Sequence, residues 1–298
     1  MYKSFKQIEE MLLEKKKIKT LALANAQDLE ALSAVVFAKN RGVINPVLIG
    51  EREKINALLR QLDEDVSEYR IIDCDNEADA ANLAMQLVAK KEADIPMKGL
   101  MQTASFMKAV LNKEYGFVPP NSLISQVTVL DWSERGKFLL ITDCAINISP
   151  DLEAKEKMIK NAVSLAHKLG IEKPKVAVIS AVEVVKDKIS STVDAKALSE
   201  MPWEDCIVGG PFALDNAVSI EAAHHKGINH PVAGDADILI MPDLCTGNVF
   251  TKSLTFFAHL ESAGAVCGTS IPVVMTSRSD TPENKYQSIL TAIMQSME

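Results

Sequence analysis

The sequence holds one residue pair that is well suited to bind a phosphate or carboxylate group, Ser277-Arg278. It directly follows the apolar run VVMT, and Arg278 is the only arginine after Arg135. The stretch 281–283 (Thr-Pro-Glu) has the residue types that favour the N-cap and first turn of a helix. A guanidinium can bind an anion through two hydrogen bonds, and a helix start offers free backbone N–H groups. The alternative is that Arg278 only pairs with Asp280 on the surface.

Four other predicted strands also end in polar or glycine-containing loops. Ligands of doubly wound α/β folds bind at the carboxyl ends of the strands, so these loops and the Ser277-Arg278 loop are predicted to share one cleft. The alternative is that these residues have no shared function, because loops are polar in any protein and helix caps are commonly Asp, Asn or Ser. The candidate binding residues in these loops are Thr103, Asp143, Asn147, Gly210, Pro211, Asp215, Asp243, Gly247, Asn248 and Lys252.

Other common ligand-binding signatures are missing or ambiguous. The sequence has neither the phosphate-binding loop of P-loop NTPases nor the G-x-G-x-x-G run of dinucleotide-binding folds. His224 and His225 are adjacent on a predicted helix, so they point to different faces and cannot chelate one metal together. Asp235 and Asp237 could bind a cation or simply keep a strand entry polar. Cys144 and Cys267 lie in apolar contexts and are expected in the core.

Short β-branched runs alternate with amphipathic segments, a phasing that predicts parallel strands covered by helices. A helix is expected after Asp28, and others over 76–91, 105–113, 150–169, 216–226 and 251–260, with a last one from Pro282. The runs SQVTVLDW and KFLLITD flank WSERG and predict an antiparallel hairpin. The fold class is therefore α/β with parallel and mixed sheets. We place one domain over 1–127 plus 271–298 and a second over 128–270.

Composition restricts the class of protein further. The 298 residues include 32 basic and 40 acidic side chains, and the net charge of −8 disfavours nucleic-acid and anionic-membrane binding. Five scattered cysteines without a C-x-x-C pair argue against disulfides or a zinc cluster and favour a reducing, cytoplasmic location. The charged N-terminus does not resemble a secretory signal, and no apolar run is long enough to cross a membrane.

Several long motifs resemble the phosphate acetyl/butyryltransferase (phosphotransacylase) family, in particular its butyryltransferase branch. They occur in the family's order and are MKGLMQTASFMKAVLNKEYG, ITDCAINISPDLEAK, GGPFALDNAVS, PVAGDADILIMPDLCTGN with KSL, and VVMTSRSDTPENK. The resemblance implies reversible transfer of a short or branched acyl group between coenzyme A and inorganic phosphate. It also implies a two-domain fold similar to isocitrate dehydrogenases, an active site in the interdomain cleft and a homodimer. Coenzyme A is then a substrate, and neither a metal nor a tightly bound cofactor is expected.

The resemblance assigns phosphoryl binding and carbonyl orientation to Ser277 and Arg278. In acetyl-specific relatives an aspartate seven positions after the serine is the proposed base for the thiol, whereas this chain has Asn284 there. Glu283 is the favoured substitute, with Asp280 as the alternative. Gly209 also departs from the family, which has an aspartate before Gly-Pro.

Three other functions remain open from the sequence. The first is an acetyl-specific phosphotransacetylase, and the second is a non-catalytic acyl-phosphate or coenzyme A sensor, which the two departures motivate. The third is a two-domain dehydrogenase for 2-hydroxy acids, which the scarcity of arginine disfavours.

Overall fold

The computed structural model describes residues 1–297, which divide into two compact units. We call residues 1–4 and 123–262 the central unit, and residues 5–122 with the chain from Ala263 onward the terminal unit. The chain therefore leaves the terminal unit once and returns to it. The domain limits predicted at 127/128 and 270/271 stay a prediction.

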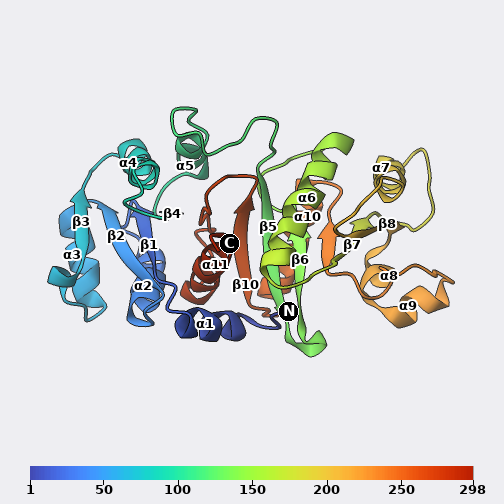
Figure 1. The fold of residues 1–298 in the computed structure, drawn as a ribbon, viewed down its shortest axis with the longest axis horizontal. Coiled ribbons are helices and arrows are strands. Elements are labelled where there is room, and N and C mark those ends of the chain that lie inside the picture. The colour runs from blue at the N-terminus through green and yellow to red at the C-terminus, as the bar shows by residue number, and fades with distance from the viewer. Residues whose placement is uncertain (298) are drawn as a thin grey trace. The chain divides into compact units, whose positions relative to one another are not determined.

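The terminal unit is built on a parallel sheet with the strand order β3-β2-β1-β4 (Figure 1). Its strands are β1 (Lys19–Ala24), β2 (Ile44–Gly50), β3 (Arg70–Asp73) and β4 (Ile95–Lys98). Residues 21–24 of β1 and 95–98 of β4 are buried, as expected for a parallel sheet whose two faces are both covered. Val274 extends the sheet beyond β4, because Lys98 N donates to Val274 O (2.9 Å) and Val274 N to Pro96 O (3.0 Å).

Helices cover this sheet on both faces. The connections from β1 through β2 to β3 run in one direction along the sheet and the connection from β3 to β4 runs in the other, so right-handed crossovers put their helices on opposite faces. They are α1 (Phe5–Glu14), α2 (Leu29–Asn40), α3 (Arg52–Gln61), α4 (Glu77–Ala89), α5 (Thr103–Val110) and α11 (Pro282–Gln295), with the 3₁₀ turn η1 (Val66–Glu68). Helix α4 packs on α5, and α11 packs on α2 through the edge-to-face pair Phe37 and Tyr286. Asp28 and Asn76 cap α2 and α4 through their side chains, as the sequence predicts for Asp28.

The central unit has the strand order β5-β6-β9-β7-β8. Its strands are β5 (Ser125–Trp132), β6 (Lys137–Thr142), β7 (Lys175–Ile179), β8 (Ile207–Phe212) and β9 (Ile238–Ile240), and β10 (Ser262–Cys267) begins at its last residue. The predicted hairpin is confirmed, since β5 and β6 pair antiparallel around the 3₁₀ turn η2 (Ser133–Arg135). Strands β6, β9, β7 and β8 are parallel.

The helices of the central unit are α6 (Leu152–Lys168), α7 (Ser190–Ser199), α8 (Leu214–Val218), α9 (Ile220–His225) and α10 (Leu244–Phe256). Connections toward β8 run through α6 and α7, and connections in the other direction run through α8, α9 and α10. The right-handed crossover rule therefore puts α7 and α10 on opposite faces. The point where the direction reverses lies between β7 and β9.

Several predicted elements differ from those observed. The helix expected over 216–226 is two short helices, because Ser219 adopts an extended conformation and caps α9 with its side chain. Helix α10 starts at Leu244 rather than at Thr251, because Asp243 caps it by accepting from Thr246 N. The expected strand IPVVMTS makes only isolated bridges at Val273 and Val274, and β10 was not predicted.

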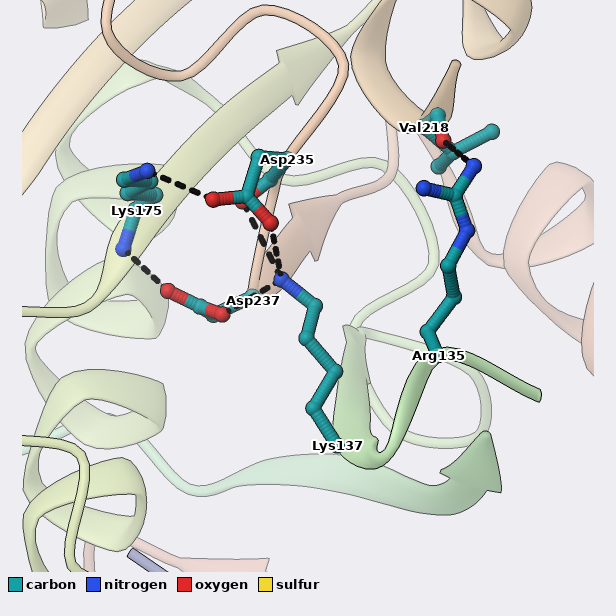
Figure 2. A network of polar contacts seen from close by, with 6 residues as sticks. All are labelled: Arg135, Lys137, Lys175, Val218, Asp235 and Asp237. Atoms are coloured by element: carbon teal, nitrogen blue, oxygen red, sulfur yellow. Dashed lines mark hydrogen bonds and ion pairs between the residues drawn. The ribbon is translucent and has the colours of Figure 1, made fainter. Parts of the chain in front are cut away.

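Asp235 and Asp237 belong to an ion-pair network at the amino ends of β6 and β7 (Figure 2). Lys137 Nζ lies 2.9 Å from Asp235 Oδ1 and 2.7 Å from Asp237 Oδ1, and Lys175 Nζ lies 2.6 Å from Asp235 Oδ2. Asp237 also accepts from Lys175 N (2.9 Å). Of the two readings left open by the sequence, the structure favours the polar strand entry, since lysines occupy the carboxylates.

Residues 1–297 contain no group of three or more His, Cys, Asp or Glu side chains placed to hold a metal ion. Over the same residues, no helix has the length and apolar character needed to span a membrane.

Candidate active site

The Ser277-Arg278 loop lies at the carboxyl edge of the terminal unit's sheet. Lys98 is the last residue of β4, and its backbone pairs with Val274, three residues before Ser277. The turn after β4 packs on the end of β1, where Gly99 N donates to Ala24 O (2.8 Å) and Leu100 N to Asn25 O (3.0 Å). A Cβ at position 99 would overlap the Asn25 carbonyl, so this approach needs glycine. Polar groups from three chain segments therefore meet at one edge.

Lys285 holds this loop in place from within α11. Its side chain is buried, and Nζ donates to Ser277 O (2.7 Å) and Asp280 O (2.8 Å). Burial lowers the pKa of Lys285. Asp280 closes the loop from the other side by accepting from Ser277 N (2.7 Å), and Ser277 Oγ lies 3.1 Å from Ser279 Oγ. The loop is thus tied at both ends by short hydrogen bonds.

Arg278 in this braced loop and Glu283 in the first turn of α11 have unpaired charged groups. Both are exposed, and among residues 1–297 neither side chain makes an ion pair or hydrogen bond. The carboxylate of Asp280 is occupied by Ser277 N, so the surface pair considered from the sequence does not form. Thr281 caps α11 by accepting from Asn284 N (3.2 Å), and Pro282 follows at the first helical position, both as predicted. A free guanidinium beside a helix start can bind an anion.

Thr103, predicted to bind substrate, is the exposed first residue of α5. Gln102 at the N-cap position makes no side-chain cap bond, and its backbone N donates instead to Glu77 Oε1 (3.0 Å). Thr103 therefore follows Lys98 by five residues, across the turn that joins β4 to α5, and lies in the same unit as Ser277 and Arg278.

In the central unit, Asp143 organises the loop that follows β6. Its carboxylate is buried and accepts from the backbone N–H of Gln126 (3.2 Å), Ala145 (2.8 Å), Ile146 (3.0 Å) and Asn147 (3.3 Å). Asn147 Nδ2 adds a fifth bond at 2.6 Å and also donates to Ile124 O (2.9 Å). Both side chains are thus used within the loop, and their predicted contact with substrate stays a prediction.

Helix α10 packs directly on this loop through Gly247 and Asn248. A Cβ on Gly247 would overlap the Asp143 carbonyl oxygen, so only glycine allows the contact, and Asn248 Nδ2 donates to Cys144 O (3.1 Å). Both residues lie inside α10, not ahead of it as predicted. Lys252 lies on the same helix with its side chain exposed. Cys144 belongs to the core, and burial raises its thiol pKa to about 12, which disfavours a nucleophilic thiolate at neutral pH.

A cavity of about 570 Å³ opens at the carboxyl ends of β7 and β9. This is where α7 and α10 leave the sheet on opposite faces, the place at which α/β sheets bind ligands. Its wall combines apolar side chains with hydroxyls and one ion pair, in which the buried Lys155 Nζ lies 2.6 Å from Oδ2 of the half-buried Asp194. Among the predicted site residues only Asp243 lines it. The sequence interpretation missed the residues Lys155, Ser180, Ser190, Ser191 and Asp194; the serine run at the start of α7 was the one visible signal.

Gly210, Pro211 and Asp215 lie in or just after β8. The strand continues through both Gly210 and Pro211, which are joined by a cis peptide bond, so these residues are not a loop as predicted. A Cβ on Gly210 would lie 3.0–3.2 Å from Val178 and Ala195, which shows close packing on β7 and α7. The exposed Asp215 carboxylate pairs with Lys226 (3.1 Å), and this hydrogen bond lowers its pKa.

Comparison with known proteins identifies the family. The model of the family described as "Phosphate acetyl/butaryl transferase" matches residues 74–293. The chain is 43% identical over 99% of its length to the phosphate butyryltransferase of Clostridium acetobutylicum (98% covered), and 43% identical over 91% to the phosphate acetyltransferase of Thermotoga maritima (93% covered). The branched-chain phosphotransacylase of Enterococcus faecalis superposes with a TM-score of 0.82 at 34% identity, over 93% of this chain and 99% of that one.

The chain belongs to the phosphate acetyl/butyryltransferase family. This confirms the resemblance and the α/β fold class inferred from the sequence. The predicted likeness to isocitrate dehydrogenases and the homodimer stay predictions.

The structure gives a physical account of one departure from the family pattern. At position 209 a Cβ would lie 2.5 Å from His230 Cε1, 2.7 Å from His230 Nδ1 and 2.8 Å from Phe212 Cε2. The imidazole of His230 thus fills the space of a side chain at this position, and its own burial lowers its pKa. An aspartate cannot be accommodated here unless His230 moves.

Proposed function

We propose that this protein catalyses reversible acyl transfer between coenzyme A and inorganic phosphate, with butyryl or another short or branched acyl group. The observation that carries the proposal is the unpaired Arg278 guanidinium, held beside the start of α11 by the loop that Lys285 and Asp280 brace. The names of the relatives agree with this chemistry. The acetyl-specific alternative also has a basis, because the Thermotoga maritima relative is a phosphate acetyltransferase of equal identity.

In the direction of acyl-CoA formation, the thiolate of coenzyme A attacks the carbonyl carbon of the acyl phosphate. The C–S bond forms, the carbonyl electrons move to oxygen, and their return breaks the C–O bond and releases phosphate. Arg278 is positioned to neutralise the leaving phosphate. Ser277 Oγ and the backbone N–H of Glu283 in the first turn of α11 can donate to developing negative charge. Holding both substrates together contributes up to about 7–11 kcal/mol to such a reaction.

The proposed reaction uses Arg278, Ser277 and a carboxylate base, and involves no metal and no tightly bound cofactor. Coenzyme A enters as a substrate. The candidate residues of the central unit, above all the cavity lined by Asp243, would serve the acyl-CoA side. An apolar wall with a few hydroxyl donors suits a ligand that combines amide and aliphatic groups.

The decisive test is an assay of the purified protein with phosphate and acyl-CoA thioesters of two to six carbons, following thiol release. We expect turnover, with the highest kcat/KM for butyryl-CoA or a branched analogue. Highest kcat/KM for acetyl-CoA would support the acetyl-specific alternative. Absence of turnover with every thioester, together with measurable coenzyme A binding by calorimetry, would identify a non-catalytic binding protein instead.

Glu283 is the proposed base for the coenzyme A thiol, because its carboxylate has no partner in residues 1–297 whereas Asp280 is engaged by Ser277 N. We expect Glu283→Gln to lower kcat about 100-fold at neutral pH, a common contribution of general base catalysis. The loss should shrink at high pH, where the thiol ionises by itself. The measurement is kcat as a function of pH.

A double variant, Glu283→Gln with Asn284→Asp, provides the control, since it places a carboxylate at the position of the proposed base in acetyl-specific relatives. Recovery of activity would show that the defect of the single variant is the missing base. An undiminished kcat in Glu283→Gln, combined with a loss in Asp280→Asn, would instead assign the base to Asp280.

A further inference from the structure

We propose that Lys98 is a second cation that binds a phosphate group together with Arg278. This inference rests on the proposed function, because it takes Arg278 as the phosphate ligand. It adds a buried lysine, contributed by a different strand, to the same site. Lysine and arginine complement each other there, since lysine provides a compact charge and arginine a planar pair of donors.

Lys98 is buried without a counter-charge. Only 4% of its surface is exposed, and its Nζ has two weak partners, the carbonyl oxygens of Gly99 and Met101, each at 3.4 Å. That distance is beyond the usual range of N–H···O hydrogen bonds. Within residues 1–297 no carboxylate lies within ion-pair distance of this ammonium group. A buried charge of this kind is costly unless a ligand or partner compensates it.

The charges around Lys98 do not provide that compensation. Burial lowers the pKa of Lys98 most, and the nearby guanidinium of Arg278 lowers it further. Asp28 and Asp280 act in the opposite direction, but neither forms an ion pair with Lys98; Asp28 caps α2 by accepting from Ala31 N (3.1 Å), and Asp280 accepts from Ser277 N (2.7 Å). Lys285 adds another positive charge, whose ammonium donates to the loop carbonyls.

Two like charges are thus held near each other at the carboxyl edge of the sheet, Lys98 by its strand and Arg278 by its braced loop. Their repulsion is relieved when an anion binds to both. A phosphate dianion suits the pair, because it has two charges to neutralise and several oxygens that accept from an ammonium and a guanidinium at once. The same chemistry is offered by inorganic phosphate and by the phosphates of coenzyme A, so the test must separate them.

The test is calorimetric titration of inorganic phosphate into wild type and Lys98→Met, Lys98→Arg and Lys90→Met variants. Methionine keeps the length of the side chain and suits burial. Lys90 is an exposed residue that follows α4 and precedes β4, so it lies toward the amino ends of the strands, away from the Ser277-Arg278 loop. We expect Lys98→Met to weaken phosphate binding about 10-fold or more, as for loss of a charge-assisted hydrogen bond. Lys98→Arg should retain part of the affinity, and Lys90→Met all of it.

A parallel titration with adenosine 3′,5′-bisphosphate distinguishes the sources. Weakening confined to inorganic phosphate identifies the phosphate substrate, and weakening confined to the nucleotide identifies a phosphate of coenzyme A; both support a phosphate site at Lys98. Unchanged affinity for both ligands in Lys98→Met, or no binding of either to wild type, would overturn it. These titrations measure binding and need no turnover. A failed acyl-transfer assay would therefore contradict the proposed function, and the effect of Lys98 on phosphate binding could still be measured.

Discussion

Replacing Arg278 by alanine should lower kcat/KM for phosphate by about 100- to 1000-fold. The guanidinium is the one group of the Ser277–Asp280 loop that is exposed, charged and unpaired, and it neutralises charge that develops on the phosphate in the proposed transition state. Because alanine removes both substrate binding and transition-state stabilisation, we expect a higher KM for phosphate and a lower kcat. Steady-state kinetics with phosphate and acyl-CoA varied separately measure both.

Two control variants make this result specific. Arg278→Lys keeps the charge but loses the planar pair of donors, and should recover only part of the activity. Arg70→Ala removes an exposed arginine of the same unit whose partner is Glu92 (3.0 Å), and should leave the kinetics unchanged. A normal KM for phosphate in Arg278→Ala would exclude the assigned role.

Replacing Asp143 by alanine should destabilise the central unit by about 3 kcal/mol. The buried carboxylate accepts five hydrogen bonds, four of them from backbone N–H groups that would lose their partner. Each buried donor left unsatisfied costs about 1–3 kcal/mol, partly offset where water enters. Both tryptophans, Trp132 and Trp203, lie in this unit, so their fluorescence during urea unfolding reports on it selectively.

Asp151→Ala is the matched control, because it removes an exposed carboxylate of the same unit that accepts a single backbone bond from Ala154 N (2.8 Å). Loss of such a helix cap costs about 1 kcal/mol. A loss in Asp143→Ala no larger than in Asp151→Ala would show that the Asp143 network does not hold the loop.

Much of the fold could be read from local patterns. The apolar period predicted α2 and α4 closely, and the capping residues Asp28 and Thr281 predicted the starts of α2 and α11, because each accepts from a backbone N–H three residues further on. The β5–β6 hairpin was equally local. Predictions failed where a distant contact decided the outcome. The expected strand around Val273 and Val274 makes only isolated bridges, Val273 with Val266 and Val274 with Met97 of β4.

For the candidate site, the sequence alone indicated Ser277 and Arg278, since a lone arginine between a strand and a helix start is visible in one dimension. It also showed that Asn284 and Gly209 depart from the family pattern. The family itself was recognisable from ordered motifs spread over about two thirds of the chain. These features depend on residue type and order, which need no knowledge of spatial neighbours.

Only the tertiary structure decided how these residues are held and which others join them. Lys285 was an ordinary helix residue in the sequence, yet folding places its ammonium on two carbonyls of the Ser277–Asp280 loop. Lys98 is buried without a counter-charge at the end of β4, where its backbone pairs with Val274, and His230 fills the space at Gly209. Burial and the pairing of charges are properties of contacts between residues far apart in the chain, so residue type and spacing could not reveal them.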